Sequence, residues 1–236
     1  MGTLCKDQLA EKLVGLFAET DPGNIDEAVA QAKDLLSRGA KQAKWNDLER
    51  LFDTQIATLK DRGVPKFIVG MLWDQKGFVL ARASTMSFEN GHVPFLPVIP
   101  RTYLSIYSQM PMVKSGDKAG YTNLKPTAIT DVVATPENPY YIYDVEDGEA
   151  MRGKTPQDAE KLIKKEGRLG LTEVEVIALG VHTDVLSKHY VEAVGSRYVS
   201  GGVPFLLRLG GDEPGLDWTS LDYGDDHWGA ASCGSR

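Results

Sequence analysis

The residues best equipped for chemistry lie close together near the end of the sequence. Residues 222–236 read Asp-Tyr-Gly-Asp-Asp-His-Trp-Gly-Ala-Ala-Ser-Cys-Gly-Ser-Arg. They include three aspartates, one of the four histidines, one of the four tryptophans and one of the two cysteines. Chain ends are usually frayed and polar, so a large aromatic side chain and a thiol predict that this tail packs onto the fold.

The tail carries the parts of a cysteine-dependent active site. Cys233 can act as a nucleophile, with His227 as its general base. Asp226 or Asp225 can orient the imidazole, and the backbone amides of residues 229–234 can stabilise an oxyanion. The alternative is structural, because acidic surroundings raise the pKa of a thiol and small neighbours are typical of a buried cysteine. The two interpretations differ in whether the thiol is exposed beside a base.

The same tail offers ligands for a divalent cation. Carboxylates such as Asp222 and Asp225 suit Mg²⁺, Ca²⁺ or Mn²⁺, and adding His227 and Cys233 favours zinc. The spacing matches neither an EF-hand loop nor a zinc knuckle, so a solvated acidic turn is the alternative.

Two further residues are candidate ligand contacts. Arg197, in Gly-Ser-Arg-Tyr, can offer a guanidinium to an anion, although no glycine-rich phosphate loop surrounds it. Trp228 offers an aromatic contact surface. The sequence contains no nucleophile elbow, zinc-protease, phosphate-loop or kinase signature, which argues against the commonest hydrolases and nucleotide enzymes. These patterns specify no cofactor.

Composition narrows the class of protein. The chain has 236 residues and a net charge of −7, so it is long enough for a sizeable core and unsuited to nonspecific nucleic-acid binding. No apolar run is long enough to span a bilayer, and no signal peptide is recognisable. Cys5 and Cys233 can form at most one bridge, and a reducing compartment is the simpler interpretation. We therefore expect a soluble cytoplasmic protein whose partner is a protein or a small molecule.

The elements that position the tail follow from hydrophobic periodicity. Residues 1–63 form a helical segment with helices over 5–18, 24–39 and 46–63, the last two opened by Asn/Glu capping patterns. Residues 64–236 form an α+β domain that continues the same core. We expect an α+β fold in which the N-terminal helices pack on a mostly antiparallel, proline-interrupted sheet with two further helices.

Within the second segment, five regions have distinct patterns. Residues 67–81 predict a β-hairpin, 93–113 predict edge strands broken by prolines, and 114–138 predict a long loop. Residues 140–145 predict a strand, and 189–236 predict strands and turns. One of the two further helices opens at Thr155-Pro156; the other opens at Thr172 with Glu175 in a capping box and ends near Leu186.

The tetrapeptide Val-Pro-Phe-Leu occurs twice, at residues 93–96 and 203–206. A duplicated half-site is one interpretation. The other, which we favour because the flanking residues share little, is a recurring way to enter a strand.

Short motifs in the second half resemble an uncharacterised bacterial family, a domain of unknown function. The motifs are Val93-Pro94, Asp144-Val-Glu-Asp-Gly148, Thr155-Pro-Gln-Asp-Ala159 and Ala230-Ala-Ser-Cys-Gly234. The tail departs from the family pattern at Ala230, where serine is usual. The resemblance covers residues 90–236, implies that the tail is an integral part of the domain, and carries over no activity.

Three functions remain, and each predicts a different arrangement. A non-enzymatic binding or interaction protein, which we favour, predicts a contiguous apolar surface patch and an inert thiol. A cysteine-dependent hydrolase or acyl transferase requires Cys233 exposed in a pocket within reach of His227. A divalent-metal site requires the tail carboxylates to converge on one point.

Overall fold

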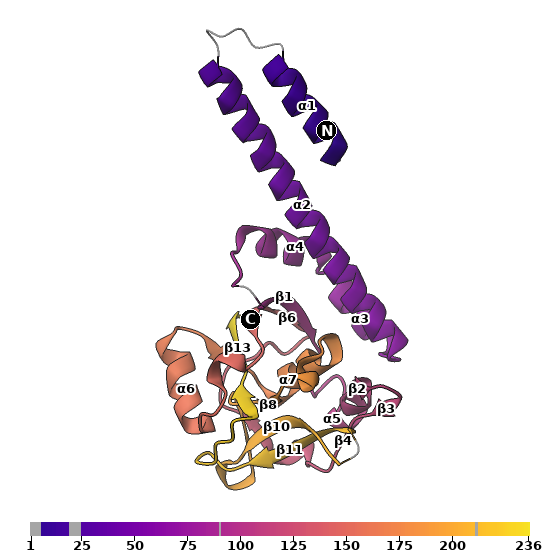
Figure 1. Ribbon diagram of the computed structural model, residues 1–236. Coiled ribbons are helices and arrows are strands. Elements are labelled where there is room, and N and C mark those ends of the chain that lie inside the picture. Colours follow the sequence, from indigo (N-terminus) through magenta and orange to yellow (C-terminus); the bar gives the residue numbers. More distant parts are fainter. Residues whose placement is uncertain (1–5, 19–24, 90, 211) are drawn as a thin grey trace.

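The computed structural model describes residues 6–18, 25–89, 91–210 and 212–236. Cys5 and Asn24, proposed above for a disulfide and a helix cap, lie outside these ranges. The fold is α+β with mostly antiparallel sheets, as the sequence predicts. The first four helices are α1 (Lys6–Ala18), α2 (Ile25–Asp61), α3 (Lys66–Trp73) and α4 (Lys76–Thr85). Figure 1 shows them on one side of the sheets, with the tip of the α1–α2 pair projecting away from the body.

Helix α2 is continuous where the sequence predicts two helices separated after Gly39. Gly39 does not end the helix; it lies against α1, where a Cβ would stand 2.8 Å from Cδ2 of Leu9. Glycine inside a helix costs about 1 kcal/mol relative to alanine, which packing can override. Continuing the helix extends one buried stripe through Leu48, Phe52 and Ile56. The predicted break was wrong because the glycine serves helix–helix contact.

The β-hairpin predicted over residues 67–81 is also wrong, because this region forms α3 and α4. The buried side chains of the two helices recur at helical spacing: Ile68, Val69 and Leu72, then Val79, Leu80 and Ala83. Asp74 and Gln75 both have helical backbone angles, so the helices follow each other without a hairpin turn. The β-branched and aromatic residues of this region favour a strand, but packing against α2 stabilises the helical conformation instead.

A four-stranded sheet has the order β1-β6-β13-β7. Its strands are β1 (Val93–Val98), β6 (Tyr140–Glu146), β7 (Leu169–Gly170) and β13 (Ser232–Ser235). The proline-bearing β1 is an edge strand, as expected of a segment that lacks amide donors. The predicted strand over residues 140–145 is confirmed, and the tail pairs with it as β13.

A five-stranded sheet has the order β12-β8-β10-β11-β4. Its strands are β4 (Tyr121–Thr122), β8 (Tyr190–Glu192), β10 (Val203–Arg208), β11 (Pro214–Thr219) and β12 (Trp228–Ala230). The two Val-Pro-Phe-Leu segments therefore lie in different sheets, one at an edge and one in the middle. This placement favours a recurring strand entry over a duplicated site.

Helices α6 (Pro156–Lys165) and α7 (Glu173–His182) are the two further helices that the sequence predicts. The Thr155 hydroxyl accepts a hydrogen bond from the amide of Asp158, and Thr172 and Glu175 form a capping box. Helix α7 ends at His182, earlier than the predicted Leu186.

Short elements complete the chain. The predicted loop 114–138 contains strand pieces, and the pieces are β2 (Lys114–Ser115), β3 (Lys118–Ala119), β4 and β5 (Ile129–Asp131). Strand β5 pairs with β9 (Ser196–Tyr198), and α5 (Ile106–Gln109) precedes β2. In the described part of the chain, no helix combines the length and the apolar character needed to cross a membrane.

The core has three parts. Helices α2, α3 and α4 pack on one face of β1 and β6. Helix α7 packs with residues of both sheets, among them Ile142 of β6 and Leu206 of β10. Ala159 and Ile163 of α6 pack with Val194 and Ala230. The C-terminal tail contributes strands to both sheets, so it is part of the core.

Candidate functional site

Cys233 is a buried free thiol in the middle of the four-stranded sheet. It pairs with Val145 of β6 and Leu169 of β7, whereas His227 precedes β12 in the other sheet. Burial raises the pKa of the Cys233 thiol to about 12, and the nearby Glu175 carboxylate adds to the rise. A thiol in this state is held protonated, so the sheet gives Cys233 the environment of a structural residue.

The end of the tail is fixed by charged contacts to α7. The guanidinium of Arg236 donates to both carboxylate oxygens of Glu175, at 2.7 Å each, and to the Gly170 carbonyl at 2.8 Å. Tyr140 donates to the same carboxylate at 2.9 Å. The bidentate pair satisfies the Glu175 carboxylate, whereas Nη1 of Arg236 is buried without a hydrogen-bond partner among the described residues.

Two of the motifs that carry the family resemblance, Asp144–Gly148 and Ala230–Gly234, are in contact at Asp144. This residue has φ of +54°, an uncommon left-handed conformation in the middle of β6. A Cβ on Gly234 of the tail would stand 3.0 Å from Oδ2 of Asp144, so glycine makes room for the aspartate. Burial opposes ionisation, but hydrogen bonds from His92 and Arg168 lower the pKa of Asp144. The two motifs lie far apart in the sequence, and nothing in either one indicates this contact.

The structure brings three predicted residues to the wall of one pocket. Asp225, His227 and Trp228 line a cavity of about 540 Å³, together with His189 and Arg208. The Asp225 carboxylate accepts from the His227 amide at 2.8 Å, which fixes the turn before β12. The pocket lies where β8, the end of β10 and this turn meet.

The other predicted residues lie elsewhere. Arg197 donates to the Glu160 carboxylate and to the carbonyls of Val194 and Ser196, so its guanidinium is already bonded. Asp222 is exposed, and a hydrogen bond from Ser220 lowers its pKa. Asp226 is exposed, and its carbonyl accepts from Arg152.

Within the described ranges, no group of three or more His, Cys, Asp or Glu side chains is arranged to hold a metal ion.

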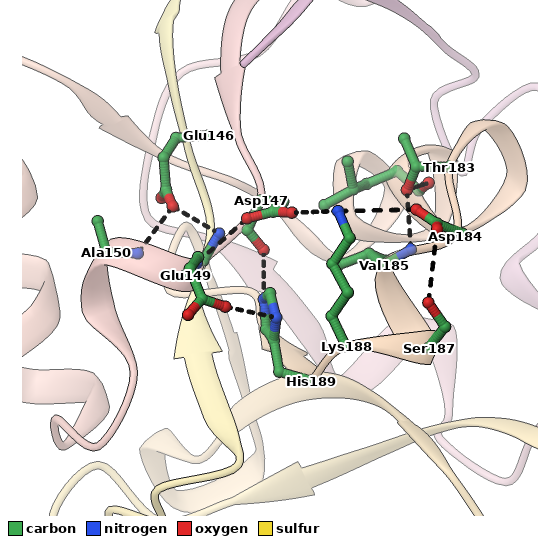
Figure 2. A network of polar contacts seen from close by, with 12 residues as sticks. Glu146, Asp147, Glu149, Ala150, Thr183, Asp184, Val185, Ser187, Lys188 and His189 are labelled. Carbon is green, nitrogen blue, oxygen red and sulfur yellow. Dashed lines mark hydrogen bonds and ion pairs between the residues drawn. The ribbon is translucent and has the colours of Figure 1, made fainter. Parts of the chain in front are cut away.

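A buried polar network beside this pocket was not predicted. His189 has a fully buried side chain, and its Nε2 donates to the Asp147 carbonyl at 3.0 Å. Its Nδ1 lies 3.4 Å from a carboxylate oxygen of Glu149. Figure 2 shows Lys188 reaching from the same segment toward Asp147 and Asp184. Nothing in the sequence around His189 indicates this role.

A second network, also missed, lies beside a cavity of about 490 Å³ that Arg101 and Asp131 line. Ser196 Oγ is 2.8 Å from an oxygen of Asp131 and 2.8 Å from one of Glu173. The Ser196 hydroxyl has one hydrogen and can donate it to only one of the two oxygens at a time. Burial raises the pKa of Glu173, and the nearby Asp131 carboxylate adds to the rise. The Arg101 guanidinium forms ion pairs with the carboxyl groups of both Asp131 and Glu173.

An apolar groove of about 780 Å³ lies between the end of α2 and α3. Trp73, 44% exposed, forms part of it, and its lining includes Lys60 and Lys66 but no acidic residue. Lys60 Nζ lies 5.5 Å from the centre of the Trp73 ring and Lys76 Nζ 5.1 Å. Phe67 on α3 and Phe78 on α4 are also exposed. Exposed apolar surface of this kind marks interaction sites in soluble proteins.

Comparison with known proteins gives a family and no activity. Residues 63–204 match a family described as "Family of unknown function (DUF5701)". The chain belongs to this family. No curated protein and no solved structure matches the chain.

The DUF5701 match confirms the expected relation to a domain of unknown function. It covers α3, α4, β1, β6, the two helices α6 and α7, and the Arg101–Glu173 network. The motif-bearing tail lies beyond residue 204, so the tail's part in the resemblance stays a prediction.

Proposed function

We propose that this DUF5701 protein is a non-enzymatic binding protein that docks an apolar segment of a partner protein in the α2–α3 groove. The observation that carries this proposal is the groove itself, an apolar surface of about 780 Å³ lined by an exposed Trp73. Tryptophan is enriched among the residues that dominate binding energy at protein interfaces.

The charge of the lining specifies the partner's chemistry. Lys60 and Lys66 border the groove, and no acid lines it, although the whole chain is acidic. A segment with apolar anchors flanked by aspartate or glutamate complements this surface, and helix-in-groove docking is the simplest geometry for it. The buried, protonated Cys233 supports a binding role over cysteine catalysis. Its free thiol supports a reducing, cytoplasmic setting.

A peptide selection tests the proposal. Helical peptides selected from a random displayed library should carry apolar anchors with acidic flanks. Trp73→Ala should weaken the best peptide by about tenfold or more, as expected for a hot-spot tryptophan. Trp218→Ala is the matched control, because Trp218 on β11 is equally exposed at 43%.

A charge reversal sharpens the test. Lys66→Glu should remove the preference for acidic flanks while leaving the apolar anchors selected. The proposal is wrong if no peptide family is enriched, or if Trp73→Ala and Trp218→Ala weaken binding equally.

A further inference from the structure

The pocket at the β8–β10 end contains an arginine with unused hydrogen-bonding capacity. Nε of Arg208 is buried without a hydrogen-bond partner. Among the described residues, its guanidinium has one charge contact, to the exposed Asp212 carboxylate at 3.8 Å, which is beyond hydrogen-bond distance. An arginine offers five N–H donors, and leaving a buried donor unpaired is costly. The Arg208 side chain is 32% exposed and lines the pocket, so the rest of its guanidinium is open to an acceptor there.

The backbone holds Arg208 in place for such an acceptor. Arg208 pairs with Pro214 across the β10–β11 ladder, and its carbonyl accepts from the Tyr190 hydroxyl at 3.2 Å. The Tyr190 amide donates to the His227 carbonyl at 2.9 Å, which joins the opposite wall to the same framework. The site is thus built from three strands and needs no folding step to form.

Arg208 is the cation of the lining that is open to an anion. Lys188 also lines the pocket, but its ammonium is paired with Asp147 and Asp184. The His189 ring is bonded to the Asp147 carbonyl, which leaves the His227 ring as a further polar group on the wall. The two acids on the wall are Asp225 and Asp212. Asp225 accepts from the backbone of its own turn, and Asp212 is 76% exposed in its side chain. Neither supplies the hydrogen bond that Arg208 lacks.

We infer that this pocket binds a small oxyanion, a phosphate or carboxylate group of a small molecule, through the guanidinium of Arg208 with His227 beside it. Planar guanidinium donors match both groups in a two-pronged geometry. The cavity of about 540 Å³ has room for more than the anionic group. Trp228, stacked on Phe205 at 4.3 Å between ring centres, supplies an apolar wall for the rest of the ligand.

Titration by NMR with inorganic phosphate, and separately with acetate, tests the inference on the full chain. Either anion should shift the Arg208 Nε–H and Trp228 indole signals in a saturable way, and the tighter of the two identifies the group. Arg208→Gln should weaken the tighter anion about tenfold, the effect of losing one charge-assisted contact. Arg50→Gln is the matched control, because Arg50 is an exposed arginine on α2.

A variant that is expected to tighten anion binding separates a loss of the site from a folding defect. Asp212→Asn removes the one carboxylate facing Arg208 and should tighten anion binding severalfold. Saturable shifts lost in Arg208→Gln and strengthened in Asp212→Asn support the site. Absence of saturable shifts, equal weakening in Arg50→Gln, or unchanged binding in Arg208→Gln overturns it.

Discussion

At the scale of single residues, the structure separates groups that look alike in the sequence. Glu175 and Glu192 are both buried glutamates. Glu175 receives two bonds from Arg236 and one from Tyr140. Both carboxylate oxygens of Glu192 lack a hydrogen-bond partner among the described residues. Its register partners are Phe205 and Ala230, so the carboxyl stands on an apolar face. Environment, and not residue type, decides which glutamate has hydrogen-bond partners.

Glu192 makes folding stability depend on pH. Burial raises the pKa of Glu192 to about 8, above the ordinary value of 4.5. Between these values the unfolded chain releases this proton and the folded chain keeps it, so the unfolded state binds fewer protons and stability falls as pH rises. The contribution is complete below about pH 4.5 and lost above about pH 8.

Glu192→Gln should remove this decrease in folding stability with rising pH. We expect the variant to exceed the wild type in free energy of unfolding by about 1–3 kcal/mol at pH 9, with little difference at pH 4.5. Urea denaturation across this pH range measures it, with the exposed Glu137→Gln as control. Parallel pH profiles for Glu192→Gln and the wild type would contradict the assignment.

At the scale of elements, glycines decide how closely segments approach. Gly148, which follows β6, and Gly229 in β12 have their backbones in contact. A Cβ on Gly229 would stand 2.0 Å from the Gly148 carbonyl oxygen. Both glycines belong to polar, turn-rich stretches of sequence, where glycine is expected for turns, and nothing in the local pattern indicates the contact.

Gly229→Ala should therefore destabilise the protein by about 3 kcal/mol, because a rigid backbone oxygen cannot move aside. Gly77→Ala is the matched control: Gly77 lies in α4 with open space around its Cα, and alanine there should stabilise by about 0.5–1 kcal/mol. Urea denaturation of both variants decides the point. Similar free energies of unfolding for the two variants would show that the Gly148–Gly229 contact is less tight than described.

At the scale of the whole molecule, stability is unevenly distributed. The first half of α2 projects with α1 away from the sheets (Figure 1). Among the described side chains before Leu48, only Ala28 and Ala32 are buried. From Leu48 to Leu59 the same helix packs into the core against Phe95 and Tyr141. A helix draws most of its stability from tertiary packing, so the two halves differ in protection.

Hydrogen exchange should show this difference within one helix. We expect amides of residues 29–45 to exchange much faster than those of residues 52–61, whose opening approaches global unfolding. Mass-spectrometric exchange on the full chain measures both segments at once. Equal protection along α2 would indicate that another surface covers the projecting helices.

The sequence by itself determined the α+β class, the capped starts of α6 and α7, and the strand over residues 140–145. These depend on local patterns, such as the Thr172–Glu175 box, that tertiary contacts reinforce. Tertiary structure decided the rest. Gly39 looks like a helix end until Leu9 packs against it, and residues 67–81 look like a hairpin until α2 supplies an apolar surface at helical spacing.

The candidate sites also combine residues that are neighbours in the sequence with residues that only the fold brings together. The residue types of the tail predicted that it packs onto the fold. Asp225, His227 and Trp228 line one pocket because they are neighbours in sequence, although they were predicted for different roles. Arg208, His189 and the Arg101–Glu173 network come from distant segments. No local pattern encodes which strands lie side by side, so only the fold could bring these groups together and remove Cys233 from solvent.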